Sequence, residues 1–226
     1  MHDAMTHPTM LRDRRDAGER LADRLERYRG DRPVVLALPR GGVVVGYEIA
    51  RRLGVALDVL IVRKIGAPDN PEYGLGALSE DGTHVIDESR VREAGYTLSD
   101  LDPTIQHELA EIRRRAEAYR GGRPGADVSG RTVILVDDGV ATGVTLRVAI
   151  RSVRSRGPRQ IVVALGVVPR DAFHQLERVA DEVVALAVPE LFFAVGEWYQ
   201  HFEQVSDQEV QRLLLESRQP ISPAPR

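Results

Sequence analysis

Two adjacent carboxylates, Asp137 and Asp138, follow the apolar run 133–136 and precede a loop rich in Gly and Thr. The apolar run is short and β-branched, which is typical of a strand buried on both faces. The loop 139–145 can direct backbone N–H groups, two Thr hydroxyls and the first turn of a helix at one point, which favours a bound phosphate. Carboxylates at the same strand edge suit sugar hydroxyls or a phosphate-bound Mg²⁺. The segment therefore predicts a sugar-phosphate site.

This segment resembles the phosphoribosyl-pyrophosphate (PRPP) motif of the type I phosphoribosyltransferases, in which a strand, two acids and Thr-Gly-x-Thr follow one another. The resemblance implies that Asp137 and Asp138 hold the ribose hydroxyls and bind Mg²⁺, mainly through PRPP itself. It assigns the 5′-phosphate to the loop residues Gly139, Val140, Ala141, Thr142, Gly143, Val144 and Thr145. Gly139 departs from the motif, where an aliphatic residue is usual, and we expect it to loosen the loop. A generic strand–turn–helix with surface Asp residues is the alternative.

A second loop, Pro39–Gly42, follows the apolar run 34–38. Arg40 is a fixed cation suited to phosphate oxygens, and Gly41 and Gly42 permit close approach of a ligand. The loop resembles the pyrophosphate-binding loop of the same family. The chain contains neither Gly-x-Gly-x-x-Gly nor Gly-Lys-Ser/Thr, which argues against a dinucleotide site and an ATPase P-loop.

Lys64 is the only lysine among 31 Lys and Arg residues, in a background that otherwise uses Arg for positive charge. Gly, Pro and Asn in the segment 63–74 predict a long loop. Several members of the family carry an Arg-Lys pair here, before a mobile loop that closes over pyrophosphate. The resemblance implies that Arg63 and Lys64 bind pyrophosphate, whereas a solvated connection is the alternative. Residues 75–79 and 83–87 predict a hairpin.

Aromatic residues gather in the segment 189–199 of a chain that is only 5% aromatic. The segment resembles the base-binding hood of purine phosphoribosyltransferases, with Phe193 as the ring that stacks on the base and Trp198 beside it. Core packing under a C-terminal helix is the alternative. Family members that act on 6-oxopurines carry an Asp where this chain has Ala141, and a methyl group cannot accept a proton. We therefore expect weak or no activity with hypoxanthine, guanine and xanthine.

The elements that must position these groups follow an α/β pattern. Helical periodicity and capping signals predict helices over 11–29, 43–53, 102–120 and 143–156, a short one near 173–179, and one opening at the capping box Ser206-x-x-Glu209. Five apolar runs predict parallel strands at 34–38, 57–62, 132–136, 161–167 and 183–188. We predict an open, mainly parallel five-stranded sheet flanked by helices, with a small hood. The whole chain, 1–226, is expected to form one domain, with its core at about 30–188, a loop and hairpin at 63–88, and the hood and last helix at 189–216.

Composition narrows the class of protein. The net charge of −3 offers no electrostatic argument for nucleic-acid binding, and the absence of cysteine excludes disulfides and Cys-ligated metals. The six histidines have no metal-ligand spacing. No apolar run approaches the roughly 20 residues of a membrane span. Residues 1–10 lack an apolar signal core, so we expect a cytoplasmic protein.

The resemblance implies transfer of ribose 5-phosphate from PRPP to a nitrogen acceptor, a nucleobase in most of the family, with Mg²⁺ as cofactor and release of pyrophosphate. Arg40, Lys64, Asp137 and Asp138 would then be the catalytic residues. It also implies a homodimer. One alternative is a regulator that binds PRPP or a nucleotide on the same fold without transfer. Another is an unrelated phosphate-sugar enzyme on a doubly wound sheet. The sequence does not identify the acceptor.

Overall fold

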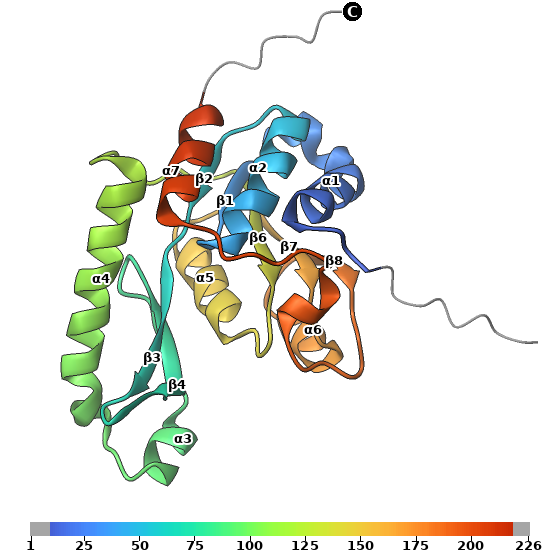
Figure 1. Ribbon diagram of the computed structural model, residues 1–226. Helices are drawn as coiled ribbons and strands as arrows, with labels where there is room; N and C mark the ends of the chain where they lie inside the picture. Colours follow the sequence, from blue (N-terminus) through green and yellow to red (C-terminus); the bar gives the residue numbers. More distant parts are fainter. Residues whose placement is uncertain (1–9, 219–226) are drawn as a thin grey trace, which may run out of the picture.

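The computed structural model describes residues 10–218. Residues 1–9, on which the expectation about a signal core rests, lie outside the described residues. The centre of the protein is a five-stranded parallel sheet with strand order β2-β1-β6-β7-β8 (Figure 1). Its strands are β1 (Val34–Ala37), β2 (Leu57–Val59), β6 (Thr132–Gly139), β7 (Gln160–Val167) and β8 (Glu182–Ala187). The predicted parallel sheet flanked by helices is therefore confirmed.

Helices cover both faces of this sheet because alternate side chains of each strand point to opposite faces. Ile134 and Val136 of β6 join one apolar cluster, and Val133 and Leu135 join the other. The first cluster packs under α1 (Arg14–Leu25), α2 (Gly41–Leu53) and α7 (Asp207–Glu216). The second packs under α5 (Val144–Ser155) and α6 (Arg170–Glu177). All strand residues from Thr132 to Val136 are buried, which explains the uninterrupted apolar run.

The helices agree with the predicted ranges except near their ends. The range 11–29 divides into α1, capped by the Asp13 side chain, and the 3₁₀ helix η1 (Glu26–Asp31). Helix α4 (Asp102–Arg120) has Leu101 at its N-cap. Asp102 and Pro103 are therefore the first two residues of the helix, and Asp102 is not its cap. The predicted helix near 173–179 ends earlier, as α6, and leaves Val179 exposed.

The segment 57–74 differs from the prediction of one strand followed by a long loop. Strand β2 ends at Val59, and a three-stranded antiparallel sheet follows, made of β3 (Val62–Ala67), β4 (Asn70–Ser79) and β5 (His84–Ile86). A Cβ on Gly66 would lie 2.3 Å from the carbonyl oxygen of Pro71. Gly and Pro therefore allow close strand pairing and a tight turn here, where the sequence suggested a loop. Only the β4–β5 part was predicted as a hairpin.

This hairpin sheet extends beside the main sheet and is covered by α4 (Figure 1). The buried guanidinium of Arg120, in the last turn of α4, lies 3.1 Å from Asp58 Oδ1 and 2.9 Å from Glu80 Oε2. Ser79 Oγ of β4 donates to Ser152 Oγ of α5 at 3.1 Å. Helix α3 (Glu88–Glu93) and the 3₁₀ helix η2 (Leu98–Leu101), neither predicted, lead into α4. Buried polar contacts thus fix the hairpin sheet to the core.

After β8 the chain crosses the carboxyl ends of the strands and reaches α7. Between β8 and α7, the only regular element is the 3₁₀ helix η3 (Val195–Trp198). Helix α7 starts at the predicted cap, where Ser206 Oγ accepts the N–H of Glu209 at 3.1 Å. Its inner face packs on the core, where Val210, Leu213 and Leu214 are buried. Within residues 10–218, no helix combines the length and the apolar character that crossing a bilayer requires.

Candidate functional site

Both acids of the motif lie inside strand β6 and not beyond its end. Asp137 is paired with Leu165 and Gly139 with Val167, because β7 continues alongside as far as Val167. Asp138 has a relative exposure of only 9%, whereas Asp137 is half-buried. The prediction that β6 ends at residue 136 and leaves Asp138 at an exposed edge is therefore wrong.

Asp138 is enclosed by groups from both ends of the chain. The Nε of Arg14 lies 2.6 Å from Asp138 Oδ2, and each of these side chains is 12% exposed. A Cβ on Gly41 would lie 1.9 Å from the same carboxylate oxygen, so only glycine lets α2 begin here. The hydroxyl of Tyr199 donates to the backbone carbonyl of Asp138. Burial, followed by the nearby charge of Asp138, raises the pKa of Tyr199 and keeps this hydroxyl a donor.

Asp137 has fewer hydrogen-bond and ion-pair partners, and its pKa is shifted. Its Oδ1 accepts the backbone N–H of Asp138 at 2.9 Å. Burial first, and the neighbouring Asp138 carboxylate second, raise the pKa of Asp137 well above the usual range. A cation bound beside this carboxyl would favour its ionised form. The two acids therefore differ: Asp138 is neutralised inside the protein by Arg14, and Asp137 is available to an incoming group.

The loop after β6 presents unpaired donors. Gly143 has φ 71° and is the N-cap of α5, with no side chain capping the helix. Within residues 10–218, no acceptor takes a hydrogen bond from the backbone N–H groups of residues 141–146. The N–H of Val140 is bonded to the carbonyl of Val167 at 3.1 Å, which anchors the loop. Free N–H groups at the positive end of a 12-residue helix form an anion site.

The glycine loop after β1 lies next to this site. Arg40 is the N-cap of α2, and the peptide bond from Pro39 to Arg40 is cis. A Cβ on Gly42 would lie 2.7 Å from the carbonyl oxygen of Val136, so α2 starts directly against β6. Arg40 Nη1 lies 4.0 Å from Asp207 Oδ1, which also accepts the Tyr119 hydroxyl at 2.5 Å. The acids, the 139–145 loop and the Arg40 loop thus meet at one edge of the sheet.

Arg63 and Lys64 lie elsewhere in this structure. Both line a cavity of about 750 Å³ between the β3–β4 hairpin and α4, and none of residues 137–145 lines it. The Arg63 guanidinium is paired with Glu108 of α4. Lys64 is exposed on β3, and no carboxylate of residues 10–218 forms a salt bridge with it. The predicted pyrophosphate ligands therefore form two separate groups, one at the strand edge and one on the hairpin.

The two hood aromatics also differ in their surroundings. Phe193 is 83% exposed, so core packing does not explain it. Trp198 is half-buried and packs against the core cluster, as the packing alternative expected. A Cβ on Gly139 would lie 2.6 Å from Val195 Cγ1 and 2.7 Å from Val167 Cγ1. Gly139 therefore lets the hood close on β6, which gives the glycine a packing role that the sequence did not suggest.

Three residues around the acids are absent from the sequence-based site: Arg14, Tyr199 and Phe202. In the sequence, Arg14 is one of many charges on an amphipathic helix, and nothing local separates it from its neighbours. Tyr199 is the last residue of the aromatic segment 189–199 and Phe202 follows it, and neither belongs to a motif. The contacts of Arg14 and Tyr199 with Asp138 join segments more than 60 residues apart, which spacing alone does not reveal.

Comparison with known proteins shows the family of the chain. Residues 9–184 match the family model of the phosphoribosyl transferase domain. The chain belongs to this family. The match covers the sheet up to β8, both glycine loops and the acidic pair. It ends before the hood and α7.

The chain is also similar to individual proteins. A Mycobacterium tuberculosis H37Rv protein, provisionally named a phosphoribosyl transferase, is 46% identical over 198 residues, which are 88% of this chain and 45% of that protein. The chain thus spans about half the length of these curated relatives. The crystal structure of TT1426 from Thermus thermophilus has 48% identity and a TM-score of 0.78, and the match covers 92% of this chain and 99% of that one. The bifunctional protein PyrR of Chloroflexus aurantiacus is 29% identical over 129 residues, or 56% of this chain and 65% of PyrR.

Proposed function

We propose that this protein transfers ribose 5-phosphate from PRPP to a nitrogen acceptor. In this reaction the bond between the anomeric carbon and the pyrophosphate oxygen breaks, and its electron pair leaves with pyrophosphate. The acceptor nitrogen forms the new bond to the anomeric carbon and loses its proton. Because positive charge develops on the sugar and negative charge on the leaving group, the site must provide both anionic and cationic partners.

One observation carries the proposal: the N-termini of α2 and α5 flank the acidic pair at a single sheet edge. Residues 141–145 of the loop supply N–H donors that are unpaired within residues 10–218 and suit the 5′-phosphate. Arg40, Gly41 and Gly42 supply a cation and free N–H groups for the pyrophosphate. Asp137 precedes the 139–145 loop in β6, its Oδ1 would lie 3.1 Å from a Cβ on Gly42, and it suits the ribose hydroxyls. Binding the remote phosphate fixes the sugar for reaction at its anomeric carbon.

Magnesium fits this donor set only as a metal held mainly by its substrate. Within residues 10–218, no cluster of three or more His, Cys, Asp or Glu side chains could hold a metal ion. Mg²⁺ is commonly bound by one or two carboxylates together with substrate phosphates, and Asp137 is the accessible carboxylate here. When bound, Mg²⁺ would neutralise charge on the departing pyrophosphate. Asp138, already paired with Arg14, is the poorer ligand.

Calorimetry and product analysis test the proposal together. PRPP should bind saturably with Mg²⁺ and much more weakly after EDTA, and a panel of bases should include one that releases pyrophosphate. Binding without release from any acceptor would favour a regulator on the same fold. Failure to bind PRPP would favour an unrelated phosphate-sugar enzyme and contradict the proposal.

The acceptor is expected to be neither hypoxanthine, guanine nor xanthine. Ala141 lies exposed at the start of the phosphate loop, where a carboxylate would be needed to face the purine ring. Another base or a non-purine nitrogen is the better candidate, with exposed Phe193 as its stacking partner. Steady-state assays of the three bases measure this, and efficient turnover of any of them would contradict the expectation.

We also expect a cytoplasmic homodimer without affinity for nucleic acid. The family resemblance motivates the dimer, and the net charge of −3 motivates the last point. Light scattering coupled to size-exclusion chromatography measures the mass in solution.

A further inference from the structure

Two segments far apart in the sequence, one just before α1 and one between η3 and α7, pair with each other beside the acidic pair. The N–H of Leu11 donates to the Trp198 carbonyl at 3.0 Å, and the N–H of Gln200 donates to the Leu11 carbonyl at 2.8 Å. The N–H of His201 donates to the Arg12 carbonyl at 2.9 Å. We call the paired segments, residues 11–14 and 198–203, the end clasp. It lies outside the sheet, next to the carboxyl end of β6.

Arg14 extends from the end clasp to Asp138. Its Nε is 2.6 Å from Asp138 Oδ2, and its Nη1 donates to the carbonyl of Glu203 at 2.7 Å. The guanidinium carbon lies 3.8 Å from the centre of the Phe202 ring. Three different partners therefore fix the planar guanidinium of Arg14. A guanidinium can make these three contacts at once, and the ammonium of a lysine cannot.

The clasp also holds the main chain of the same residue. Phe202 stacks on Tyr199 at a ring-centre distance of 5.0 Å, and the Tyr199 hydroxyl donates to the Asp138 carbonyl. A Cβ on Gly166 would lie 2.0 Å from that hydroxyl oxygen, so the tyrosine occupies space that a side chain on β7 would need. Both the carboxylate and the backbone of Asp138 are thus positioned by the chain ends.

This arrangement has an electrostatic reason. Two neighbouring carboxylates in a desolvated strand repel each other, and the Arg14 cation offsets that repulsion where water is largely excluded. With Asp138 turned toward Arg14 and the start of α2, Asp137 remains the acid that faces an incoming group.

We propose that Arg14 is a positioning residue of the acidic pair and that the end clasp is part of the sugar-binding site. Arg14 fixes Asp138 and thereby sets the backbone and the charge around Asp137. This role rests on the proposed function, because it concerns the same site. It assigns a binding contribution to two segments that the sequence motif does not include.

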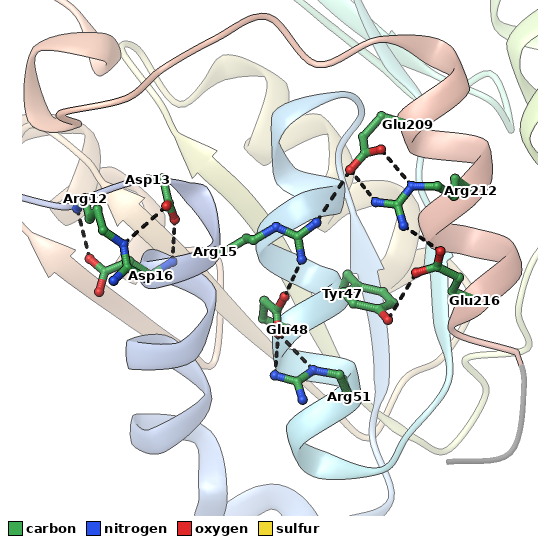
Figure 2. A network of polar contacts seen from close by, with 10 residues as sticks. All are labelled: Arg12, Asp13, Arg15, Asp16, Tyr47, Glu48, Arg51, Glu209, Arg212 and Glu216. Carbon is green, nitrogen blue, oxygen red and sulfur yellow. Dashed lines mark hydrogen bonds and ion pairs between the residues drawn. The ribbon is translucent and has the colours of Figure 1, made fainter. Parts of the chain in front are cut away.

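Helix α1 has other attachments, so Arg14 can be replaced without undocking it. Arg15 Nη1 lies 3.1 Å from buried Glu48 of α2, and Arg15 Nη2 lies 3.7 Å from Glu209 of α7 (Figure 2). Leu21 and Leu25 are buried in the core. A functional effect of Arg14 substitution is therefore separable from loss of the helix.

The test compares Arg14→Gln and Arg14→Lys with Arg20→Gln, whose side chain forms a surface pair with Asp16 on the same helix. Arg14→Gln should raise the PRPP Kd and KM by on the order of 10–100-fold, as loss of a group that orients a ligand does. Arg14→Lys should recover part of that loss, and Arg20→Gln should bind as the wild type does. Turnover at saturating PRPP should change less than KM, which a general loss of folded protein would not produce.

A double-mutant cycle with Asp138→Asn separates positioning from indirect effects. Because both single changes break the same contact, the double variant should bind PRPP no more weakly than the worse single variant. Hydrogen exchange at residues 137–140 of the ligand-free protein should accelerate in Arg14→Gln and not in Arg20→Gln.

If wild-type protein binds PRPP and Arg14→Gln binds it equally well, the positioning role is overturned and the proposed function stands. Additive losses in the cycle, or unchanged hydrogen exchange, would also overturn it. A wild-type protein that fails to bind PRPP would overturn the proposed function first, and the role of Arg14 at the sugar site with it.

Discussion

Asp137 and Asp138 are neighbours in one strand, yet their surroundings give them different properties. Asp138 is paired with a buried guanidinium, whereas Asp137 has a raised pKa and a backbone N–H as its recorded partner. Sequence motifs treat the two acids as a pair. In the structure, Asp138 is anchored internally by Arg14, and no salt bridge within residues 10–218 involves Asp137.

The raised pKa of Asp137 predicts a pH-dependent stability. The folded state holds this proton more tightly than the unfolded state, so the stabilisation is complete below the unfolded pKa of about 3.9 and is lost as pH rises through the higher folded pKa. Asp137→Asn, which cannot ionise, should remove this part of the decline in unfolding free energy. Denaturant titrations across pH measure it, with exposed Asp171→Asn as the control. Parallel pH profiles for wild type and Asp137→Asn would contradict the assignment.

Gly139→Ala tests the packing between the hood and β6. The added methyl would meet Val195 and Val167 at 2.6–2.7 Å, so it should destabilise the protein by about 1–3 kcal/mol through overpacking. Gly30→Ala is the matched control, because a Cβ there meets nothing within 4 Å. Denaturant unfolding measures both variants. If the Gly139→Ala protein is as stable as the Gly30→Ala protein, the hood moves to accept the methyl group without loss of unfolding free energy, which contradicts the prediction.

Residue types at the site were predictable because the motif places acids, Gly and Thr at fixed spacing. Their burial was not, since it depends on how far the neighbouring strand β7 continues alongside β6. Arg14 had no local signal, because its role arises only when the two ends of the chain meet.

At the scale of elements, the β3–β4 hairpin replaces the predicted loop. Gly66 and Gly76 allow backbones to approach so closely that a Cβ would clash, and such contacts depend on the partner strand. Composition alone therefore favoured a loop. By contrast, the strands of the main sheet were predictable, because burial on both faces leaves a continuous apolar run.

Lys64→Ala tests whether the hairpin contributes to PRPP binding. Lys64 is an exposed strand residue, so its loss should change stability by no more than about 0.5 kcal/mol. We expect lower turnover or weaker PRPP affinity, because a charge for pyrophosphate is removed, and partial retention in Lys64→Arg. Steady-state kinetics measure this. Unchanged kinetics in Lys64→Ala would leave the residue an ordinary solvated side chain.

Arg120→Met tests how α4 is fixed to the sheet. The Arg120 side chain is 8% exposed and pairs with Asp58 and Glu80, so its removal leaves two carboxylates without their cation. Loss of one partner of a buried ion pair costs about 3–5 kcal/mol. Exposed Arg113→Met on the same helix should be nearly neutral. Thermal or denaturant unfolding compares them, and equal stability of the two variants would contradict a structural role for the pair.

At the scale of the molecule, the family match covers both glycine loops and the sheet as far as the first half of β8, whereas the hood and α7 lie beyond the matched residues. The fold was predictable because β-strand and helix patterns alternate along the chain. The separation of the hairpin cavity from the strand edge was not, because it depends on how α4 packs against β3.

The pairing of Leu11 with Tyr199 closes a loop of nearly the whole chain, which gives it a kinetic consequence. A contact between residues so distant in sequence can form only at the entropic cost of closing the long loop between them. Such contacts therefore form late in folding. The chain's only tryptophan, Trp198, accepts the N–H of Leu11 in this pairing, so its fluorescence reports on this step. In stopped-flow refolding, the fluorescence change should lag behind the far-ultraviolet circular dichroism of the helices. On a ribosome, Asp138 would accordingly lack its contacts with Tyr199 until residues 198–203 have emerged, long after strand β6 has been synthesised.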